Sequence, residues 1–184
     1  MNEDLVVLFS GGADSTLLLK MAREMGKKPF AVMIDYGQLH IEELEFAKRY
    51  LDRTKIENMT IKIDGYNINS ALTGNGEKNL YEGVNIHHVA QRNTIFISIA
   101  AGVAESKNID EIWYGANHQD LELNFPDCLQ QYIEKMNKLL EISGSKPIKI
   151  YAPLLGMEKY MIKSLMKQYD INEDEVFSGY GEFA

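Results

Sequence analysis

The sequence predicts an α/β protein with a doubly wound, open parallel sheet of five strands and helices on both faces. Short apolar runs alternate with amphipathic stretches along the whole chain. Most of these runs are apolar at nearly every position, which is typical of parallel strands covered on both faces. A length of 184 residues leaves room for one such domain with a sizeable core. We therefore expect a single domain over residues 1–184.

Ten elements follow from these patterns. The expected strands are 5–9, 30–34, 59–63, 111–116 and 148–152. The expected helices are 15–25, 41–51, 94–104, 127–140 and 159–169. The helix at 94–104 is apolar on nearly every side, so we expect it to be buried in the middle of the structure. The Asn- and Gly-rich segment 64–88 is predicted to be a mobile lid or binding loop.

Composition and charge exclude several classes of protein. The chain is 45% hydrophobic and 25% charged, as ordinary globular proteins are, which argues against disorder. A net charge of -8 argues against a broad nucleic-acid-binding face, although a local basic groove remains open. No apolar run approaches the length of a membrane span, and the first residues lack the basic start of a signal peptide. We expect a cytoplasmic protein.

Cysteine and histidine content bears on metal binding. Cys128 is the single cysteine of the sequence, which excludes an internal disulfide and a cysteine-cluster zinc site within this chain. His87, His88 and His118 do not have the spacing of metal ligands. We therefore expect no bound zinc, and magnesium only together with a nucleotide.

The end of the first strand carries the most informative motif. It reads Ser10-Gly11-Gly12-Ala13-Asp14-Ser15-Thr16 and is followed directly by a helix. Glycines let the main chain approach a polyphosphate, and the amides at a helix start point at the anion with the helix dipole behind them. The three hydroxyl side chains add donors. The plain structural alternative is a tight turn with Asp14 or Ser15 as the helix N-cap.

This motif resembles the Ser-Gly-Gly-x-Asp-Ser signature of the PP-loop ATP pyrophosphatases, with every specified position present. It differs from the Walker loop, because no Gly-Lys-Ser/Thr follows. The resemblance implies an adenine nucleotide alpha hydrolase-like fold, ATP and Mg²⁺ as cofactors, and an enzyme that adenylates its substrate and releases pyrophosphate.

A second resemblance begins at Asp35-Tyr36-Gly37-Gln38, which is similar to a run in the 7-cyano-7-deazaguanine synthase family of queuosine biosynthesis. Further matches lie in the family's order, and the resemblance as a whole covers roughly residues 5 to 165. These matches are Arg92-Asn93-Thr94, Gly115-Ala116-Asn117 with Asp120, Phe125-Pro126-Asp127-Cys128, and Ala152-Pro153-Leu154-Leu155 with Lys159.

The resemblance implies three sets of site residues. Those implied to be catalytic are Asp14, Arg92 and Lys159. Those implied to bind the nucleotide are Ser10, Gly11, Gly12, Asp14, Ser15, Thr16, Asp35, Tyr36, Arg92 and Gly115. Those implied to bind the deazapurine are Asn93, Asn117, Asp120, Pro126 and Asp127. Plain alternatives stay open at three positions: Arg92 as a solvated helix end, Lys159 as a surface lysine, and Asp127 as the N-cap of the next helix.

The implied reaction is ATP-dependent adenylation of 7-carboxy-7-deazaguanine, followed by reaction with ammonia to give the 7-amido compound, the 7-cyano compound or both, in a homodimer. Alternatives are another PP-loop amide-forming or tRNA-modifying ligase, and a catalytically reduced nucleotide-binding protein. The sequence departs from the family pattern at two places. No tail cysteines follow Val176, and Gln91 stands where the family has a small residue. From the first departure we expect the second adenylation to be slow, so that the amide accumulates.

Overall fold

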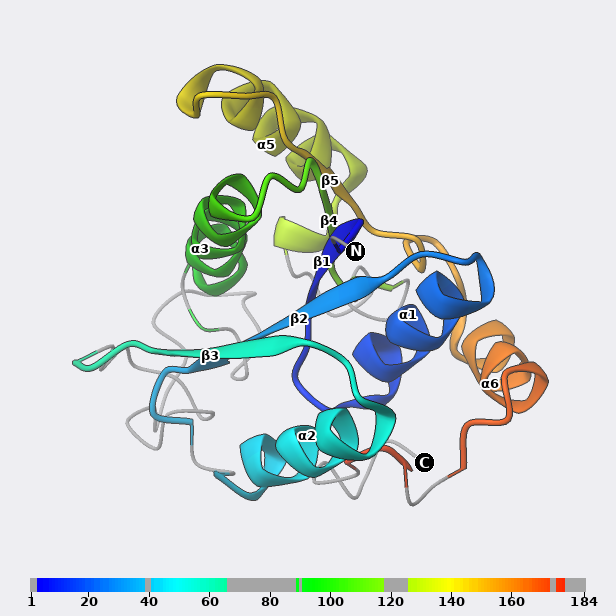
Figure 1. The fold of residues 1–184 in the computed structure, drawn as a ribbon. Helices are drawn as coiled ribbons and strands as arrows, with labels where there is room; N and C mark the ends of the chain where they lie inside the picture. The colour runs from blue at the N-terminus through cyan, green and yellow to red at the C-terminus, as the bar shows by residue number, and fades with distance from the viewer. Residues whose placement is uncertain are drawn as a thin grey trace, which may run out of the picture.

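A computed structural model describes residues 3–38, 41–65, 89, 91–117, 126–172 and 175–177. Strands and helices alternate along this part of the chain (Figure 1). The strands are β1 (Leu5–Leu8), β2 (Pro29–Asp35), β3 (Asn58–Lys62), β4 (Glu111–Trp113) and β5 (Lys149–Tyr151). The helices are α1 (Ala13–Glu24), α2 (Ile41–Thr54), α3 (Arg92–Ser106), α5 (Gln130–Ser143) and α6 (Lys159–Gln168), with a short 3-10 helix η2 (Pro126–Cys128) before α5.

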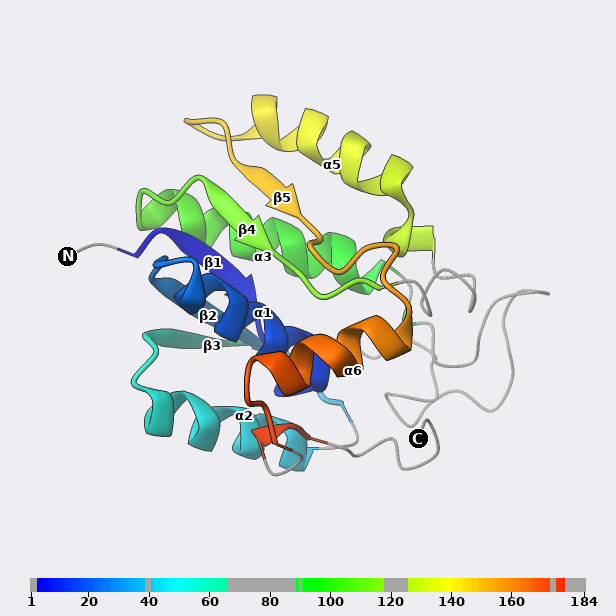
Figure 2. The same ribbon diagram turned by 90° about the vertical axis from the view of Figure 1, so that its right-hand side faces the viewer.

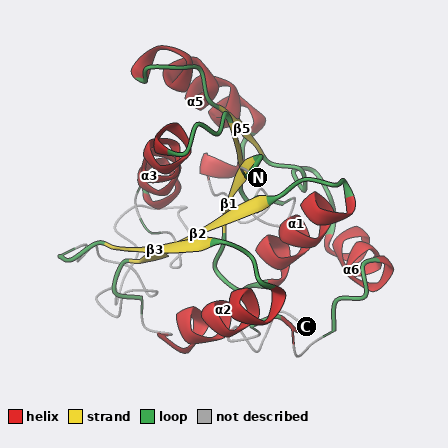
Figure 3. Cartoon of the chain, viewed as in Figure 1, coloured by secondary structure: helices red, strands yellow, loops and turns green. Residues whose placement is uncertain are grey.

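The five strands form one parallel sheet in the order β3-β2-β1-β4-β5 (Figure 2), and Figure 3 colours the strands yellow and the helices red. The chain moves outward from β1 to β3, returns past β1 to β4, and then moves outward to β5. This reversal makes the sheet doubly wound, as predicted. It also places a switch point between β1 and β4, and ligands of open parallel sheets bind at such a point, beyond the carboxyl ends of the strands.

Alternate residues of the central strands β1, β2 and β4 belong to two separate cores. Val6 and Ile112 pack with α3 and α5, whereas Val7 and Met33 pack with α1, α2 and α6. Figures 1 and 2 show the two helical layers on opposite sides of the sheet. The central strands β1, β2 and β4 are buried on both faces, which explains why their sequences are largely apolar, whereas the edge strands β3 and β5 are mostly exposed.

Three expectations about the elements need correction. Helix α3 does not lie in the middle of the structure: it covers one face of the sheet and exposes Ser98 and Gly102. The helix expected to start at residue 127 starts at Gln130, because Pro126–Cys128 forms a separate 3-10 turn. The fourth strand ends at Trp113, three residues before its expected end. Most of the expected loop 64–88 lies outside the described residues, which stop at 65 and resume at 89.

No helix in the described ranges is both long enough and apolar enough to cross a lipid bilayer.

A side chain of α5 pairs with the free edge of strand β5. Asn137 of α5 accepts a hydrogen bond from the backbone N–H of Ile150 at 2.7 Å and donates one to its carbonyl at 3.1 Å. The carboxamide thus does for Ile150 what a neighbouring strand would do, and it covers part of an edge that could otherwise pair with another chain.

Replacing Asn137 by Ala should therefore lower the free energy of unfolding by about 1–3 kcal/mol, because two backbone groups lose their partner. Lys138→Ala, an exposed neighbour on the same helix, is the matched control and should change it by less than about 0.5 kcal/mol. Urea unfolding of both variants measures the difference. Equal stabilities would contradict the proposed role of Asn137.

Tyr50 of α2 lies in the core on the α1 side, 3% exposed, with its ring 5.6 Å from that of Phe9. Burial, and secondly the charge of Glu175, raise the pKa of Tyr50 to about 12. Its pKa in the unfolded chain is about 10. The folded protein therefore holds this proton more tightly, so the resulting stability is complete below pH 10 and is lost as pH rises toward 12.

Stability should accordingly fall between about pH 10 and 12, with Tyr50 contributing at most about 1.4 kcal/mol per pH unit. Tyr50→Phe should flatten this fall, whereas Tyr160→Phe, at a site 69% exposed, should not. Urea unfolding at several alkaline pH values tests this. The same slope in wild type and Tyr50→Phe would be the contrary result.

Candidate active site

The loop that follows β1 has the backbone of an anion-binding turn. Gly11 adopts a left-handed φ of +92°, and Gly12 is the N-cap of α1 with φ -73° and ψ 166°. A side chain at Gly11 would place its Cβ 3.1 Å from the Cβ of Ala47 and 3.3 Å from the carbonyl oxygen of Glu43. Only glycine fits there without strain. Because Gly12 is the cap, the alternative that Asp14 or Ser15 caps the helix is wrong.

Hydroxyl groups tie this loop together. The Ser15 hydroxyl donates to the Gly12 carbonyl at 3.1 Å and accepts from the Ser10 backbone N–H at 3.3 Å. The Ser10 hydroxyl accepts from the Gly12 N–H at 3.3 Å. The Thr16 hydroxyl is buried and, within the described part of the chain, has no hydrogen-bond partner. Ser10 and Ser15 therefore shape the loop, while a phosphate contact by Thr16 would need the loop to move.

The switch point of the sheet lies directly against this loop. After β4, the side-chain amide of Asn117 donates to the Asp14 carboxylate at 2.9 Å. A Cβ on Gly115 would stand 3.1 Å from the Cβ of Asp14 and 3.5 Å from the backbone nitrogen of Ser15. The structure thus brings Asp14, Gly115 and Asn117 together, as expected for the crevice between β1 and β4.

A second group of predicted site residues lies where β2 ends and α3 begins. The Asp35 carboxylate accepts from the Gly37 N–H at 3.2 Å and so shapes the turn after β2. The guanidinium of Arg92 donates to the Tyr36 hydroxyl at 3.4 Å, and the Tyr36 ring lies 5.2 Å from that of Phe96. The segment that begins at Asp35 and the segment that begins at Arg92, which both resemble the same family, are therefore in contact in the folded chain.

Gln91 precedes this group and is the N-cap of α3 with a left-handed φ of +58°. That conformation costs most side chains about 1 kcal/mol or more and suits a glycine or asparagine. Glycine at this position would relieve that strain, because it has no Cβ.

Of the residues implied to bind the deazapurine, all but Asp120 lie in the part of the chain that the structure describes. Asn93 is half-buried in the first turn of α3, and Pro126 and Asp127 lie in η2. Asp120 lies outside the described residues, as do His87, His88 and His118. The N-cap of α5 is Leu129, so the alternative that Asp127 caps this helix is wrong.

Tyrosines that the motifs did not single out hold this region. The Tyr114 hydroxyl donates to the Asp127 carbonyl at 3.0 Å, and the Tyr132 hydroxyl lies 3.0 Å from that of Thr94. Burial raises the pKa of Tyr132, although its hydrogen bond with Thr94 acts in the opposite direction. In the sequence Tyr132 reads only as part of an apolar helix face, so no signal distinguished it.

Lys159 is the first residue of α6, after the N-cap Glu158. Helices that follow parallel strands begin beyond the carboxyl ends of those strands. Lys159 therefore lies toward the same edge of the sheet as the loop, and Figure 2 shows α6 starting on that side. Its implied catalytic role remains a prediction.

The C-terminal segment also reaches the loop. The backbone N–H of Phe177 donates to the Gly11 carbonyl at 2.8 Å, and the Phe177 ring lies 6.2 Å from that of Phe46. Sequence reasoning missed this contact, because a backbone donor has no side-chain signature.

A model of one protein family, described as "Queuosine biosynthesis protein QueC", matches residues 4–183. The chain belongs to this QueC family. The similar curated proteins are named 7-cyano-7-deazaguanine synthase. One from Picrophilus torridus is 37% identical over 95% of this chain and 77% of its own length. One from Saccharophagus degradans is 34% identical over 97% of this chain and 84% of its own length.

Solved structures similar to this QueC-family chain share its fold at low sequence identity. The U34-tRNA thiolase NcsA from Methanococcus maripaludis, with its [4Fe-4S] cluster, has a TM-score of 0.61 and 18% identity. That match covers 93% of this chain but 58% of the thiolase. The NH3-dependent NAD synthetase from Campylobacter jejuni has a TM-score of 0.59 and 20% identity, covering 95% of this chain and 67% of the synthetase. These structures confirm the predicted doubly wound α/β fold.

The described part of the QueC-family chain has no group of three His, Cys, Asp or Glu side chains placed to hold a metal ion. Mg²⁺ prefers one or two carboxylates together with substrate phosphates, so it does not require such a group. Asp14, beside the anion-binding turn, fits that requirement.

Proposed function

We propose that this chain uses ATP to adenylate the carboxylate of 7-carboxy-7-deazaguanine and then transfers the acyl group to ammonia. The observation that carries the proposal is the contact between the phosphate loop and the switch point, where Asn117 binds Asp14 at 2.9 Å. This contact supports a nucleotide site and a neighbouring acceptor site at one edge of the sheet. Family membership supports the deazapurine as that acceptor.

In the first step a carboxylate oxygen of the substrate attacks the α-phosphorus of ATP, and pyrophosphate leaves with the electron pair of the broken P–O bond. Ammonia then attacks the acyl carbon, AMP leaves and a proton is lost, which gives the amide. A second ATP can adenylate the amide oxygen, and loss of AMP and the amide protons gives the nitrile. The steps mainly need positioning and charge neutralisation.

The described residues can supply both needs. The loop amides and the start of α1 would bind the pyrophosphate portion, with Ser10 and Ser15 holding the loop in shape. Arg92 would stabilise the charge that develops on phosphate oxygens, helped by Lys159. Asp35 and Tyr36 would face the adenosine. When bound, Mg²⁺ neutralises phosphate charge, and Asp14 is the residue that would hold it.

The deazapurine would lie beyond β4. We propose that Asn93, Asn117 and Asp127 hydrogen-bond its edge while Pro126 contacts its ring, with Asp120 in the segment between them. Asn117 then has two roles, because it also orients Asp14.

Product analysis tests the proposal. Purified protein is incubated with 7-carboxy-7-deazaguanine, ATP, Mg²⁺ and ammonia, pyrophosphate release is followed, and products are identified by mass. We expect pyrophosphate release to require 7-carboxy-7-deazaguanine, and we expect the amide, the nitrile or both as products. Release stimulated by tRNA or by a different acid would favour another PP-loop ligase, and binding of ATP without release would favour a reduced binding protein.

We also propose that the chain folds as a single domain, acts in the cytoplasm and forms a homodimer. The second adenylation step remains an open part of the proposal, and the ratio of amide to nitrile over time measures it.

The metal content gives a separate prediction. Because Cys128 is the single thiol of the chain and is buried, we expect no stoichiometric zinc in the purified protein, and chelation should leave it folded. Elemental analysis and thermal unfolding with and without a chelator check this. One tightly held zinc per chain would contradict it.

A further inference from the structure

The hydrogen bond from Phe177 to Gly11 acts on a peptide group of the phosphate loop. The carbonyl of Gly11 and the N–H of Gly12 belong to one planar trans peptide, so they point in opposite directions. Binding the carbonyl on the side of Phe177 therefore fixes the opposite direction of the Gly12 N–H. On that side the N–H meets the Ser10 hydroxyl at 3.3 Å.

This peptide is the one in the loop with the least intrinsic preference for its orientation. Both flanking residues are glycines, which populate left- and right-handed conformations with similar ease. A rotation of the peptide would exchange the N–H for the carbonyl oxygen and present a negative dipole to an anion. An external contact is therefore needed to keep the anion-binding orientation dominant.

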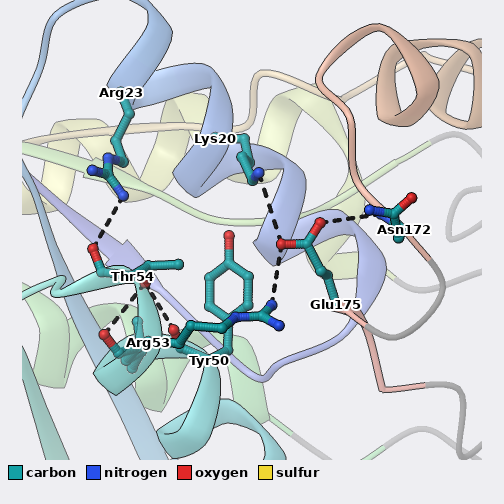
Figure 4. Close-up of polar contacts among 8 residues, drawn as sticks. Lys20, Arg23, Tyr50, Arg53, Thr54, Asn172 and Glu175 are labelled. Carbon is teal, nitrogen blue, oxygen red and sulfur yellow. Dashed lines mark hydrogen bonds and ion pairs between the residues drawn. The ribbon is translucent and has the colours of Figure 1, made fainter.

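Glu175 holds the segment that supplies this contact (Figure 4). Its carboxylate lies 3.1 Å from the Arg53 guanidinium of α2 and 3.8 Å from the Lys20 ammonium of α1. The second carboxylate oxygen accepts from the Asn172 N–H at 3.1 Å, and the Glu175 N–H donates to the Asn172 carbonyl at 2.9 Å. The Glu175 side chain is 14% exposed, so this ion pair is better shielded than a typical surface pair.

We propose that Glu175 is a positioning residue for ATP: by joining residues 175–177 to α1 and α2, it keeps the Phe177 N–H on Gly11 and the Gly12 N–H on the Ser10 side of the loop, where the phosphates would bind. Glu175 itself does not touch the nucleotide. The proposal rests on the proposed function of the loop. If the anion-binding orientation becomes a minor fraction, the apparent Kd for ATP rises by the inverse of that fraction.

Two pairs of variants separate this role from general stability. Phe177→Pro removes the backbone donor and the ring, whereas Phe177→Ala removes the ring alone. Glu175→Gln removes the charge that binds α1 and α2, whereas Arg23→Gln removes a more exposed contact between the same two helices, the 3.2 Å bond from Arg23 to the Thr54 carbonyl. Calorimetry measures the Kd for ATP with Mg²⁺, and steady-state pyrophosphate release gives KM and kcat.

We expect Phe177→Pro and Glu175→Gln to raise the Kd and KM for ATP about tenfold, the equivalent of one hydrogen bond, with kcat changed less than about twofold. Phe177→Ala and Arg23→Gln should stay within about twofold of wild type in all three constants. If Phe177→Pro does not fold, the comparison of Glu175→Gln with Arg23→Gln decides. If the two variants of each pair have the same Kd and KM for ATP, the proposed role of Glu175 is wrong, while the proposed function is unaffected. A wild-type chain that binds no ATP overturns both.

Discussion

Replacing Asp14 by Ala should reduce ATP-dependent pyrophosphate release by at least about 100-fold, the effect expected when one preorganised group is removed from a charged site. Asp14 lies in the first turn of α1 and accepts the Asn117 amide. The Ala variant removes both the negative charge and this acceptor. It should also cost about 1 kcal/mol of stability, because Asn117 is 8% exposed and its amide is left without that acceptor.

Asp14→Asn separates charge from structure. Its carboxamide oxygen can still accept from Asn117, so stability should stay near wild type while pyrophosphate release is lost as in the Ala variant. Asp52→Asn, an exposed carboxylate of α2, is the matched control. Initial rates and urea unfolding are measured for all three. Wild-type release by Asp14→Asn would show that the charge has no part in catalysis and that Mg²⁺ is held elsewhere.

Gly115→Ala should lower kcat/KM for ATP by about 100-fold. The new Cβ would be 3.1 Å from the Cβ of Asp14, so either the loop or the end of β4 must move. A displacement of about 1 Å at a catalytic site can cost this much in rate. The free energy of unfolding should fall by about 1 kcal/mol, the lower end for adding a methyl group to a packed position.

The matched control is Gly102→Ala in α3, where a Cβ meets nothing within 4 Å. This variant should gain about 0.5–1 kcal/mol, because alanine is the better helix former, with unchanged kinetics. Kinetic constants and denaturation curves of both variants are compared. Normal kinetics in Gly115→Ala would mean that the contact between β4 and the loop does not constrain the site.

Strand positions were predictable to within three residues. The central strands β1, β2 and β4 are buried on both faces and stand out as apolar runs. The mostly exposed edge strands β3 and β5 still carry apolar residues at alternate positions, among them Ile61 and Ile150. Helix α3 shows where this reasoning fails. Its small residues Ser98 and Gly102 interrupt the apolar surface so little that the exposed face could not be distinguished from the buried one. The start of α5 was misjudged because Pro126 begins a 3-10 turn whose residues also fit a helical pattern.

The candidate site, like the fold, could be predicted from the sequence only in part. The loop after β1 carries a side-chain and glycine signature, and the other motifs could be recognised by their order along the chain. Hydrogen bonds made by the backbone have no such sequence signature. The Phe177 N–H donates to the Gly11 carbonyl, and the Ile150 N–H donates to the Asn137 side chain. Asn137 reads as one polar residue on a helix, and only the folded geometry shows it in the role of a strand.

The central position of β1 has a consequence for how the loop opens. Leu5–Leu8 pairs with β2 on one side and β4 on the other, so its amides are released only when the sheet itself comes apart. The segment 175–177 is held instead by the side-chain ion pairs of Glu175 and a short turn rather than by a sheet, and such regions exchange their amide hydrogens through local opening. The loop is therefore supported by one slowly exchanging and one rapidly exchanging segment. Native-state hydrogen exchange should find its amides protected on the timescale of the C-terminal segment rather than that of β1.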